Sequence, residues 1–179
     1  MPSRSQRRVI NANADLRLKI TDSVIDDEAY ALYERYIIEK HADGDMFPPD
    51  REQYESFLNN SLGCTQYFRL YDKGRLVCVA VSDQMLDGLA AIYTFYDPDL
   101  DKRSLGTFAV LLQISHAKKL GLPYVYLGYW IDGCRKMSYK TRFKPLEMLS
   151  NGRWHGDGDS STSGLSTIPV VNVSGDARD

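Results

Sequence analysis

Residues 66–98 read QYFRLYDKGRLVCVAVSDQMLDGLAAIYTFYDP, and this stretch decides the fold. Three apolar runs are separated by two turn signals, Asp72-Lys73-Gly74 and Asp87-Gly88, and the third run ends at Asp97-Pro98. Short runs rich in β-branched and aromatic residues, bounded by Asp, Gly and Pro, are typical of strands joined by tight turns. The stretch therefore predicts an antiparallel meander of three strands.

Upstream of the meander, the sequence predicts one strand and two helices. Residues 13–20 alternate leucine and isoleucine with polar residues, which is the period of a half-buried strand. Asp26 can cap a helix that runs to about Lys40, and a second helix follows Pro48-Pro49. Two helices therefore separate the first strand from the meander.

Downstream of the meander, a helix is expected first, because Ser104 can cap it and Gly121 can end it. A strand over residues 124–129 follows, then a polar, cationic loop with a helical turn over 131–142 and a last strand over 143–149. This order of elements resembles the acyl-CoA N-acyltransferase architecture of the GNAT acetyltransferases. It implies an α+β fold with a mixed, mainly antiparallel sheet flanked by helices.

The chain is expected to form one domain, because 43% of its 179 residues are apolar and can build one core. We place that domain at residues 13–154, after a basic leader over residues 1–12. Residues 155–179 are rich in Gly, Ser and Asp and almost free of aromatic residues. Such a segment buries too little surface to offset its ordering entropy, so a disordered tail is expected.

Composition limits the kinds of partner. Lys and Arg number 22 and Asp and Glu 24, so there is no overall basic signature and any RNA contact must be a local patch. Cys64, Cys78 and Cys134 are too few and too scattered for a disulfide framework or a tetrahedral metal site, so no metal is expected. No apolar run approaches the roughly 20 residues of a membrane span, and we expect a cytoplasmic location.

A phosphate-binding loop is expected before the helix that follows the meander. In the GNAT architecture this loop presents backbone N–H groups, and the helix N-terminus attracts negative charge. Here the loop is residues 101–107, where Gly106 lets the backbone approach a ligand and Arg103 can pair with a phosphate through two hydrogen bonds. A capped helix with an exposed arginine explains the same residues without a ligand.

Several segments together resemble the arginyl-tRNA protein transferase family. They are PSRSQRR (2–8), KHADGDM (40–46), YTFYDPDL (93–100), RSLGTFA (103–109) and LGYWIDGCRKMSYKTRFKPLE (127–147). The resemblance is to the bacterial aspartate/glutamate leucyltransferase branch and covers roughly residues 2–154. Members of the family carry an upstream N-terminal domain with a cysteine-rich motif, and none of the cysteines here stands in such a motif. The resemblance therefore implies the catalytic, C-terminal part of such an enzyme.

The resemblance implies an aminolysis in which the α-amine of a protein that begins with Asp or Glu attacks the aminoacyl ester of tRNA, without a cofactor. An α-amine has a pKa of roughly 7.7–8, so a base or a water relay must accept a proton at neutral pH. Asp97 is the candidate that binds the ammonium or takes its proton, and a simple turn at residues 97–99 is the alternative. Tyr126 could border the ester carbonyl, although most tyrosines on a central strand pack in the core.

The tRNA end must be held by charge and by base stacking. A cationic segment is expected to provide both, because four cations lie within eight residues and beside aromatic residues. The spacing of Lys136 and Lys140 would place both on one face of a helix. A solvated, charged surface is the alternative. The residues expected to bind aminoacyl-tRNA are Arg103, Ser104, Leu105, Gly106, Thr107, Tyr129, Trp130, Arg135, Lys136, Lys140 and Arg142.

His41, in the KHADGDM segment, suggests a base or a metal ligand. A helix that ends near Ala42 and stops at Gly44 explains this histidine without chemistry, and we favour that interpretation. Positioning of a substrate loop is the second interpretation.

Three functions stay open on the sequence. The first is transfer of an amino acid, leucine rather than arginine, from aminoacyl-tRNA to proteins with N-terminal Asp or Glu, which tags them for degradation. The second is an acetyl-CoA-dependent N-acetyltransferase that would hold the cofactor pyrophosphate at residues 103–107. The third is an inactive fragment that binds tRNA or an acidic N-terminus without transfer. Side-chain pockets form from positions distant in sequence, so the pattern does not decide between leucine and arginine as donor.

Overall fold

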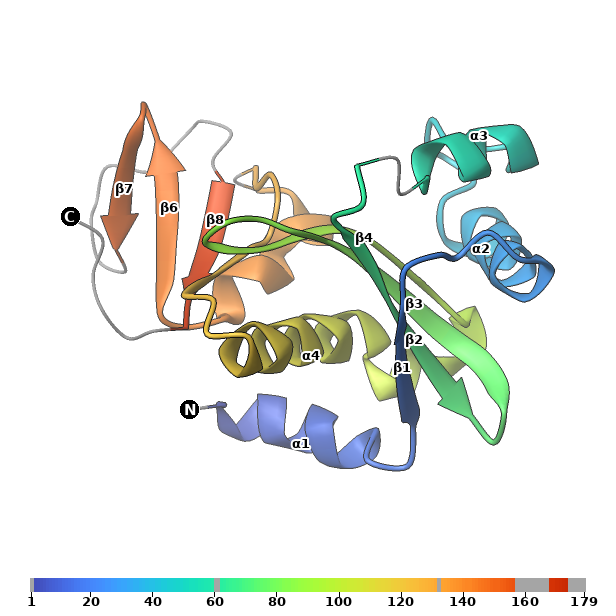
Figure 1. The fold of residues 1–179 in the computed structure, drawn as a ribbon, viewed down its shortest axis with the longest axis horizontal. Coiled ribbons are helices and arrows are strands. Elements are labelled where there is room, and N and C mark those ends of the chain that lie inside the picture. Colours follow the sequence, from blue (N-terminus) through green and yellow to red (C-terminus); the bar gives the residue numbers. More distant parts are fainter. Residues whose placement is uncertain (1, 60–61, 132, 157–167, 174–179) are drawn as a thin grey trace. The chain divides into compact units, whose positions relative to one another are not determined.

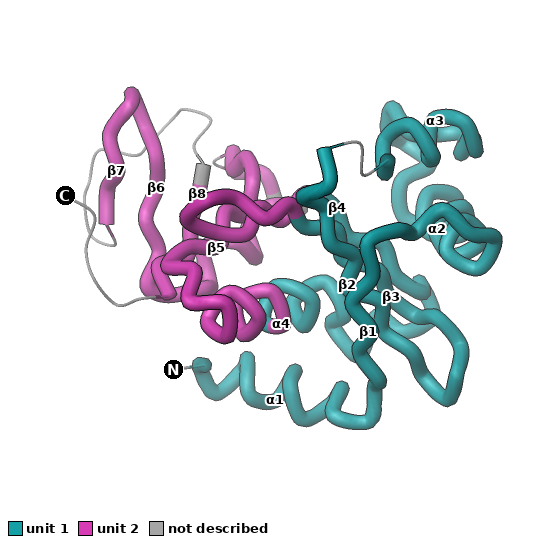
Figure 2. Tube along the Cα trace, viewed as in Figure 1, with its two compact units in different colours: residues 1–82, 93–111 teal, residues 83–92, 112–179 magenta. Residues whose placement is uncertain are grey.

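The computed structural model describes residues 2–59, 62–131, 133–156 and 168–173 (Figure 1). Contacts divide the chain into two compact units (Figure 2). We call them the first unit, Met1–Ser82 with Tyr93–Leu111, and the second unit, Asp83–Ile92 with Leu112–Asp179.

The first unit consists of strands with helices beside them. Its elements are α1 (Arg4–Ala12), β1 (Arg17–Thr21), α2 (Asp27–Lys40), α3 (Arg51–Phe57), β2 (Thr65–Asp72), most of β3 (Arg75–Gln84), the end of β4 (Gly88–Tyr96), the 3-10 helix η1 (Pro98–Arg103) and the start of α4 (Leu105–Lys119). β1 pairs antiparallel with β2, from Arg17↔Tyr71 to Thr21↔Tyr67. The first strand, the two following helices and the meander are thus confirmed.

Local sequence sets where the helices of the first unit begin. The Asp26 carboxylate accepts a hydrogen bond from the backbone N–H of Ala29 at 2.9 Å and caps α2, as the sequence predicts. Ser3 and Gln6 form a capping box at the start of α1. Most of the basic leader expected over residues 1–12 is therefore a helix.

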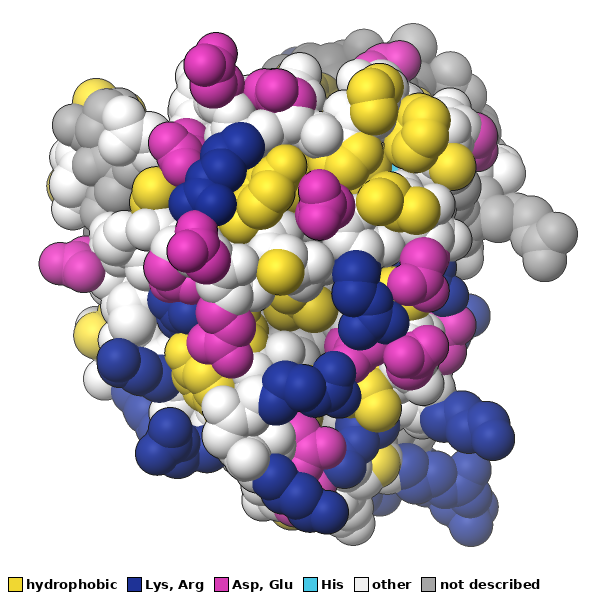
Figure 3. All heavy atoms as spheres, turned by 90° about the vertical axis from the view of Figure 1, so that its right-hand side faces the viewer, with side chains coloured by type: hydrophobic (Ala, Val, Ile, Leu, Met, Phe, Trp, Pro, Cys, Tyr) yellow, Lys and Arg dark blue, Asp and Glu magenta, His cyan; other side chains and the backbone are white. Residues whose placement is uncertain are grey.

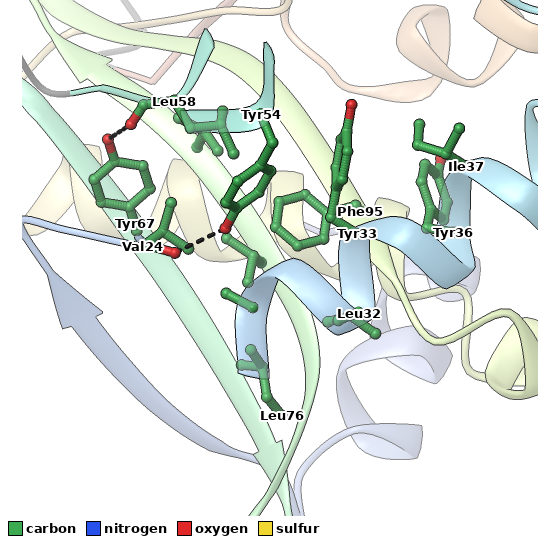
Figure 4. Close-up of a cluster of buried hydrophobic side chains, with 13 residues drawn as sticks. Val24, Leu32, Tyr33, Tyr36, Ile37, Tyr54, Leu58, Tyr67, Leu76 and Phe95 are labelled. Atoms are coloured by element: carbon green, nitrogen blue, oxygen red, sulfur yellow. Dashed lines mark hydrogen bonds between the residues drawn. The ribbon is translucent and has the colours of Figure 1, made fainter. Parts of the chain in front are cut away.

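An aromatic cluster packs α2 and α3 onto the strands of the first unit (Figure 4). The Tyr33 ring centroid lies 4.9 Å from that of Tyr54 and 5.6 Å from that of Phe95, in the tilted and edge-on contacts that aromatic pairs prefer. The Tyr54 hydroxyl is buried, and it donates to the Val24 carbonyl oxygen at 2.7 Å. The cluster therefore buries large rings while this hydroxyl keeps a partner.

The second unit contains the tips of β3 and β4, the rest of α4 and five further elements. These are β5 (Tyr124–Tyr126), the 3-10 helix η2 (Arg135–Arg142), β6 (Leu146–Ser150), β7 (Arg153–Gly156) and β8 (Ile168–Asn172). β5 pairs in parallel with β4 and antiparallel with β8, and β6 pairs antiparallel with β8 and β7. Asn151 and Gly152 both have positive φ and join β6 to β7, as an Asn-Gly hairpin turn requires.

The strands follow one another through hydrogen bonds in the order β1-β2-β3-β4-β5-β8-β6-β7. The β4–β5 pair is parallel, whereas β1–β2, β5–β8, β8–β6 and β6–β7 are antiparallel. The expected α+β fold with a mixed, mainly antiparallel sheet and flanking helices is therefore confirmed.

Part of the tail expected over residues 155–179 belongs to the sheet. β7 continues to Gly156, and β8 inserts between β5 and β6. Val170 and Val171 are 0% and 2% exposed. The run IPVVN therefore buries apolar side chains, although the segment as a whole is rich in Gly, Ser and Asp. For these residues the expectation of a disordered tail is wrong; residues 157–167 and 174–179 lie outside the described part of the chain.

Two element boundaries also differ from expectation. The strand expected over residues 124–129 ends at Tyr126, because Gly128 has φ +75°, a left-handed conformation that a strand does not tolerate. Ser104 directly precedes α4, yet its backbone is left-handed, with φ 54° and ψ 47°. An N-cap residue has extended backbone, so Ser104 instead ends η1.

Val170→Ala is expected to lower the free energy of unfolding by about 1–3 kcal/mol, because it removes buried apolar surface and leaves a cavity. Urea unfolding followed by fluorescence measures the loss. Val173→Ala is the matched control, since Val173 lies just beyond β8 and is only half-buried. Equal, small losses for the two variants would contradict the insertion of β8 into the sheet.

Candidate functional site

The residues expected to act on substrate fall into both units. Asp97 and residues 103–107 belong to the first unit, whereas Tyr126, the Tyr129-Trp130 pair and η2 belong to the second. Two local arrangements result, one in each unit.

Asp97 directly follows β4 and is the N-cap of η1. Its side chain is fully buried, and one oxygen accepts a hydrogen bond from the backbone N–H of Asp99 at 3.1 Å. Arg35 lies 3.4 Å from the carboxylate, and Arg75 donates a charge-assisted hydrogen bond to it. Because both carboxylate oxygens have cationic or N–H partners, the contacts favour an anchoring role for Asp97 over that of a general base.

Arg103, the last residue of η1, is held by carboxylates of the first unit. Its guanidinium donates two hydrogen bonds to Asp15, at 3.0 and 2.8 Å, and its Nη2 lies 3.9 Å from a carboxylate oxygen of Asp72. The hydrogen bond to Asp15 raises the pKa of Arg103. A phosphate would have to compete with two carboxylates for this guanidinium, so the segment is less cationic than its sequence suggests.

The other residues of the 103–107 segment begin α4. Leu105 is 1% exposed, which makes it a core residue. Gly106 faces the last residue of β4, because a Cβ placed on it would lie 3.6 Å from Cε1 of Tyr96. Thr107 is half-buried. Within residues 103–107, the backbone of Gly106 therefore lies next to the Tyr96 ring with no side chain between them.

In the second unit, β4 and β5 approach closely at Gly88. A Cβ at this position would lie 2.6 Å from the Tyr124 carbonyl oxygen and 2.9 Å from the Tyr126 ring, so only glycine fits without a shift. The Tyr126 hydroxyl donates to Oδ2 of Asp87 at 2.9 Å. Tyr126 thus ties β5 to the turn between β3 and β4, and its expected place beside an ester carbonyl stays a prediction.

A lysine lies where the β4–β5 pairing ends. A Cβ on Gly128 would be 3.6 Å from Nζ of Lys140 and 3.8 Å from the carbonyl oxygen of Ala91. The Lys140 ammonium donates to the Tyr129 carbonyl oxygen at 2.6 Å, and burial lowers the pKa of Lys140. The Tyr129 side chain is 67% exposed. The Lys140 ammonium next to the Gly128 backbone is suited to bind a phosphate. The exposed Tyr129 ring is suited to stack on a base.

The remaining expected residues surround this lysine in sequence. The indole N–H of Trp130 is buried and has no hydrogen-bond partner among the described atoms. Arg142 is exposed. The backbone of Arg135 and Lys136 lies in η2, and their side chains lie outside the described part. η2 is a 3-10 helix rather than an α-helix, and the expected common face of positions 136 and 140 stays a prediction.

The face of the molecule turned to the viewer in Figure 3 carries Lys, Arg, Asp and Glu side chains intermixed, with hydrophobic side chains between them. Several charges of the first unit are paired. Arg51 lies 2.7 Å from Asp27 and 2.9 Å from Glu55, and Lys40 lies 2.5 Å from Asp101. These pairs reduce the local positive charge around Arg51 and Lys40.

Two further findings concern metals and membranes. Within the described ranges, no three His, Cys, Asp or Glu side chains gather as a potential metal site. Burial raises the pKa of the Cys78 thiol in β3, which makes it a poor nucleophile. None of the described helices combines the length and apolar character needed to cross a bilayer.

Sequence reasoning missed the residues that hold the expected ones in place. Asp87 and Gly88 read only as a turn, although they fix Tyr126 and the β4–β5 contact. The local sequence did not predict ion pairs for Asp15, Arg35 and Arg75, because their partners lie 88, 62 and 22 positions away in the chain.

Comparisons with known proteins identify the family of the chain. Residues 28–150 match the family described as arginine-tRNA-protein transferase, C terminus. The chain is 51% identical over 152 residues to the aspartate/glutamate leucyltransferase of Stutzerimonas stutzeri, covering 85% of this chain and 65% of that protein. It is 51% identical to the enzyme of the same name from Teredinibacter turnerae, covering 86% and 63%. The chain therefore spans just under two thirds of the length of these relatives.

Solved structures resemble the chain in fold alone. A GNAT-family acetyltransferase from Staphylococcus aureus Mu50 has a TM-score of 0.57 at 16% identity, covering 88% of this chain and 99% of that one. The ribosomal-protein-S18-alanine N-acetyltransferase of Escherichia coli has a TM-score of 0.54 at 17% identity, covering 88% and 94%. The expected GNAT-like architecture is confirmed.

Asp97→Asn is expected to lower the free energy of unfolding by about 1–3 kcal/mol, because it removes the buried negative partner of two arginines that are themselves partly solvated. Chemical denaturation measures the change. Asp99→Asn is the control, since that side chain is 76% exposed and pairs with the same Arg35; its loss should be about 0–1 kcal/mol. If Asp97→Asn is as stable as Asp99→Asn, the proposed anchoring role of Asp97 is wrong.

Proposed function

Because the chain belongs to the arginine-tRNA-protein transferase family, matching its C-terminal region, we propose that it is an aminoacyltransferase that uses aminoacyl-tRNA. The donor is leucyl-tRNA, and the acceptors are proteins that begin with Asp or Glu. The name of its relatives, aspartate/glutamate leucyltransferase, supports leucine over arginine. The product is tagged for degradation in the cytoplasm.

The reaction needs no cofactor. The acceptor α-amine attacks the carbonyl carbon of the leucyl ester, a C–N bond forms, and the C–O bond to the 3′ oxygen of tRNA breaks. The protein must hold the tRNA end, admit the amine and remove one proton from the ammonium.

The position of Lys140 is the observation that carries the proposal. Its ammonium lies beside Gly128 and donates to the Tyr129 carbonyl, next to the point where β4 and β5 stop pairing. We assign to Lys140 and the cationic η2 the phosphate of the tRNA end, and to the exposed Tyr129 ring the stacking of a terminal base. Arg142 extends the cationic segment.

The contacts of Arg103 argue against the acetyl-CoA alternative. In that alternative Arg103 would bind a pyrophosphate, yet it donates two hydrogen bonds to Asp15 and lies near Asp72. A pyrophosphate gains less from an arginine whose charge is already matched. The expected role of Gly106 and the start of α4 in aminoacyl-tRNA binding stays a prediction.

The first experiment separates the candidate functions. The chain is mixed with labelled leucyl-tRNA, arginyl-tRNA or acetyl-CoA and with peptides that begin with Asp, Glu or Ser. The proposal predicts leucine on the Asp and Glu peptides and no acetylated product. Binding of tRNA without transfer would favour the inactive-fragment alternative, and acetylation would replace the proposal.

Lys136→Ala combined with Lys140→Ala is expected to weaken tRNA binding and to reduce the slope of log Kd against log salt by about 1–2, because two phosphate contacts are lost. Lys118→Ala with Lys119→Ala is the matched control, since both lysines are exposed at the end of α4 and the charge change is the same. Filter binding over a salt series measures both. Equal slopes for the two double variants would exclude the assignment of η2.

A further inference from the structure

We propose that β1 is a docking edge for an extended peptide segment in which acidic residues alternate with apolar ones. The segment adds to the sheet as a further strand, through backbone hydrogen bonds to the outer edge of β1. The inference concerns the first unit alone, and it does not depend on the proposed aminoacyl transfer.

β1 (dark blue in Figure 1) is an edge strand. It stands first in the order of the sheet, and its one strand neighbour among the described residues is β2. In an antiparallel pair only every second residue directs its N–H and C=O groups to the neighbouring strand. The groups of the other residues of β1 therefore point away from β2, toward the outer edge.

An apolar row that is covered at β2 continues uncovered onto β1. Leu70 and Phe68 of β2 are each 1% exposed. Their partners in β1, Leu18 and Ile20, are 39% and 37% exposed. Leu18 and Ile20 are two residues apart, so both side chains lie on one face of the strand. A strand added beside β1 would cover these two side chains with its own apolar residues.

The opposite face of β1 carries positive charge. Arg17 and Lys19 alternate with the two apolar residues, so both lie on this face. The Arg17 guanidinium is 5.6 Å from the Tyr71 ring centroid, and in the described ranges neither Arg17 nor Lys19 has an ion-pair partner. Arg69, which pairs with Lys19 across the strands, is matched by Asp26. Carboxylates on an added strand would therefore be attracted to Arg17 and Lys19.

The same two cations disfavour a second copy of the chain as the occupant. An antiparallel pairing of two β1 strands about their central residue would place Lys19 directly opposite Lys19. A parallel pairing in register would place each cation beside its own equivalent. Like charges directly opposite one another destabilise a strand pair, and lysine on an edge strand is a common means of preventing self-association. The charges thus favour an acidic partner strand.

β1 is held at both ends. Before the strand, Asp15 accepts two hydrogen bonds from Arg103, and the Asn13 side-chain amide donates to the Arg103 carbonyl oxygen at 2.8 Å. At the end of the strand, the Thr21 hydroxyl donates to the Ser23 carbonyl oxygen at 2.7 Å. A strand fixed at both ends loses little conformational entropy when a peptide adds to it, which lowers the cost of binding.

Fluorescence anisotropy tests the docking edge with a seven-residue peptide that alternates valine with glutamate and is acetylated, so that it cannot accept an amino acid. We expect saturable binding, and about 10-fold weaker binding when lysine replaces glutamate. Methylation of the backbone nitrogen at every second residue should abolish binding in one alternation and preserve it in the other, because only one edge of the added strand faces β1. Equal effects of the two methylation patterns would overturn strand addition.

Arg17→Glu combined with Lys19→Glu is expected to reverse the preference, so that the lysine peptide binds more tightly than the glutamate peptide. Tight binding of the lysine peptide also shows that this variant is folded. Arg4→Glu with Arg8→Glu is the matched control, since both arginines are exposed on α1 and the charge change is the same. The control should keep the preference of the unmutated protein.

Hydrogen exchange locates the bound peptide. The glutamate peptide is expected to slow exchange in residues 17–21 of the unmutated protein and not in the Arg17→Glu, Lys19→Glu variant. Unchanged exchange in residues 17–21 of the unmutated protein, or a double variant that still prefers glutamate, would overturn the proposal. A dimer of the unmutated chain in sedimentation velocity, with slowed exchange in the same residues, would replace the peptide by a second copy.

Discussion

The parallel pairing of β4 with β5 extends over only three residue pairs, from Gly88↔Tyr124 to Ala90↔Tyr126, and the candidate site of the second unit depends on it. Gly88 permits the close approach, because any side chain there would meet the Tyr124 carbonyl. Beyond Tyr126 the backbone turns toward β8, with the Leu127 N–H donating to the Pro169 carbonyl at 2.9 Å. The polar groups around Gly128 and Lys140 gather where the two strands stop pairing.

Charge is distributed differently in the two units. In the first unit Arg35, Arg75 and Arg103 are matched by Asp97 or Asp15, which stabilises the ends of β4 and η1 and leaves little cationic character for a ligand. In the second unit Lys140 pairs with a backbone carbonyl, and burial lowers its pKa. The partner of Lys140 is a neutral carbonyl, whereas that of Arg103 is a carboxylate, and this difference supports the proposed tRNA contact at Lys140.

The sequence predicted what short-range patterns encode. The turn signals around the meander and the Asp26 cap appear as expected. β8 was missed because its burial comes from strands distant in sequence, and its five residues are surrounded by Gly, Ser and Asp. The ionic partners of Asp97 and Arg103 could not be predicted either, because an ion pair between residues far apart in the chain produces no periodic sequence pattern.

The central claim is that this chain holds the leucyl end of tRNA rather than acetyl-CoA. Calorimetric titration with a stable amide analogue of 3′-leucyl-adenosine, alongside acetyl-CoA, tests it most directly. The account predicts saturable binding of the leucyl analogue, weakened by Lys140→Ala, and no binding of acetyl-CoA. Tight binding of acetyl-CoA with none of the leucyl analogue would contradict it.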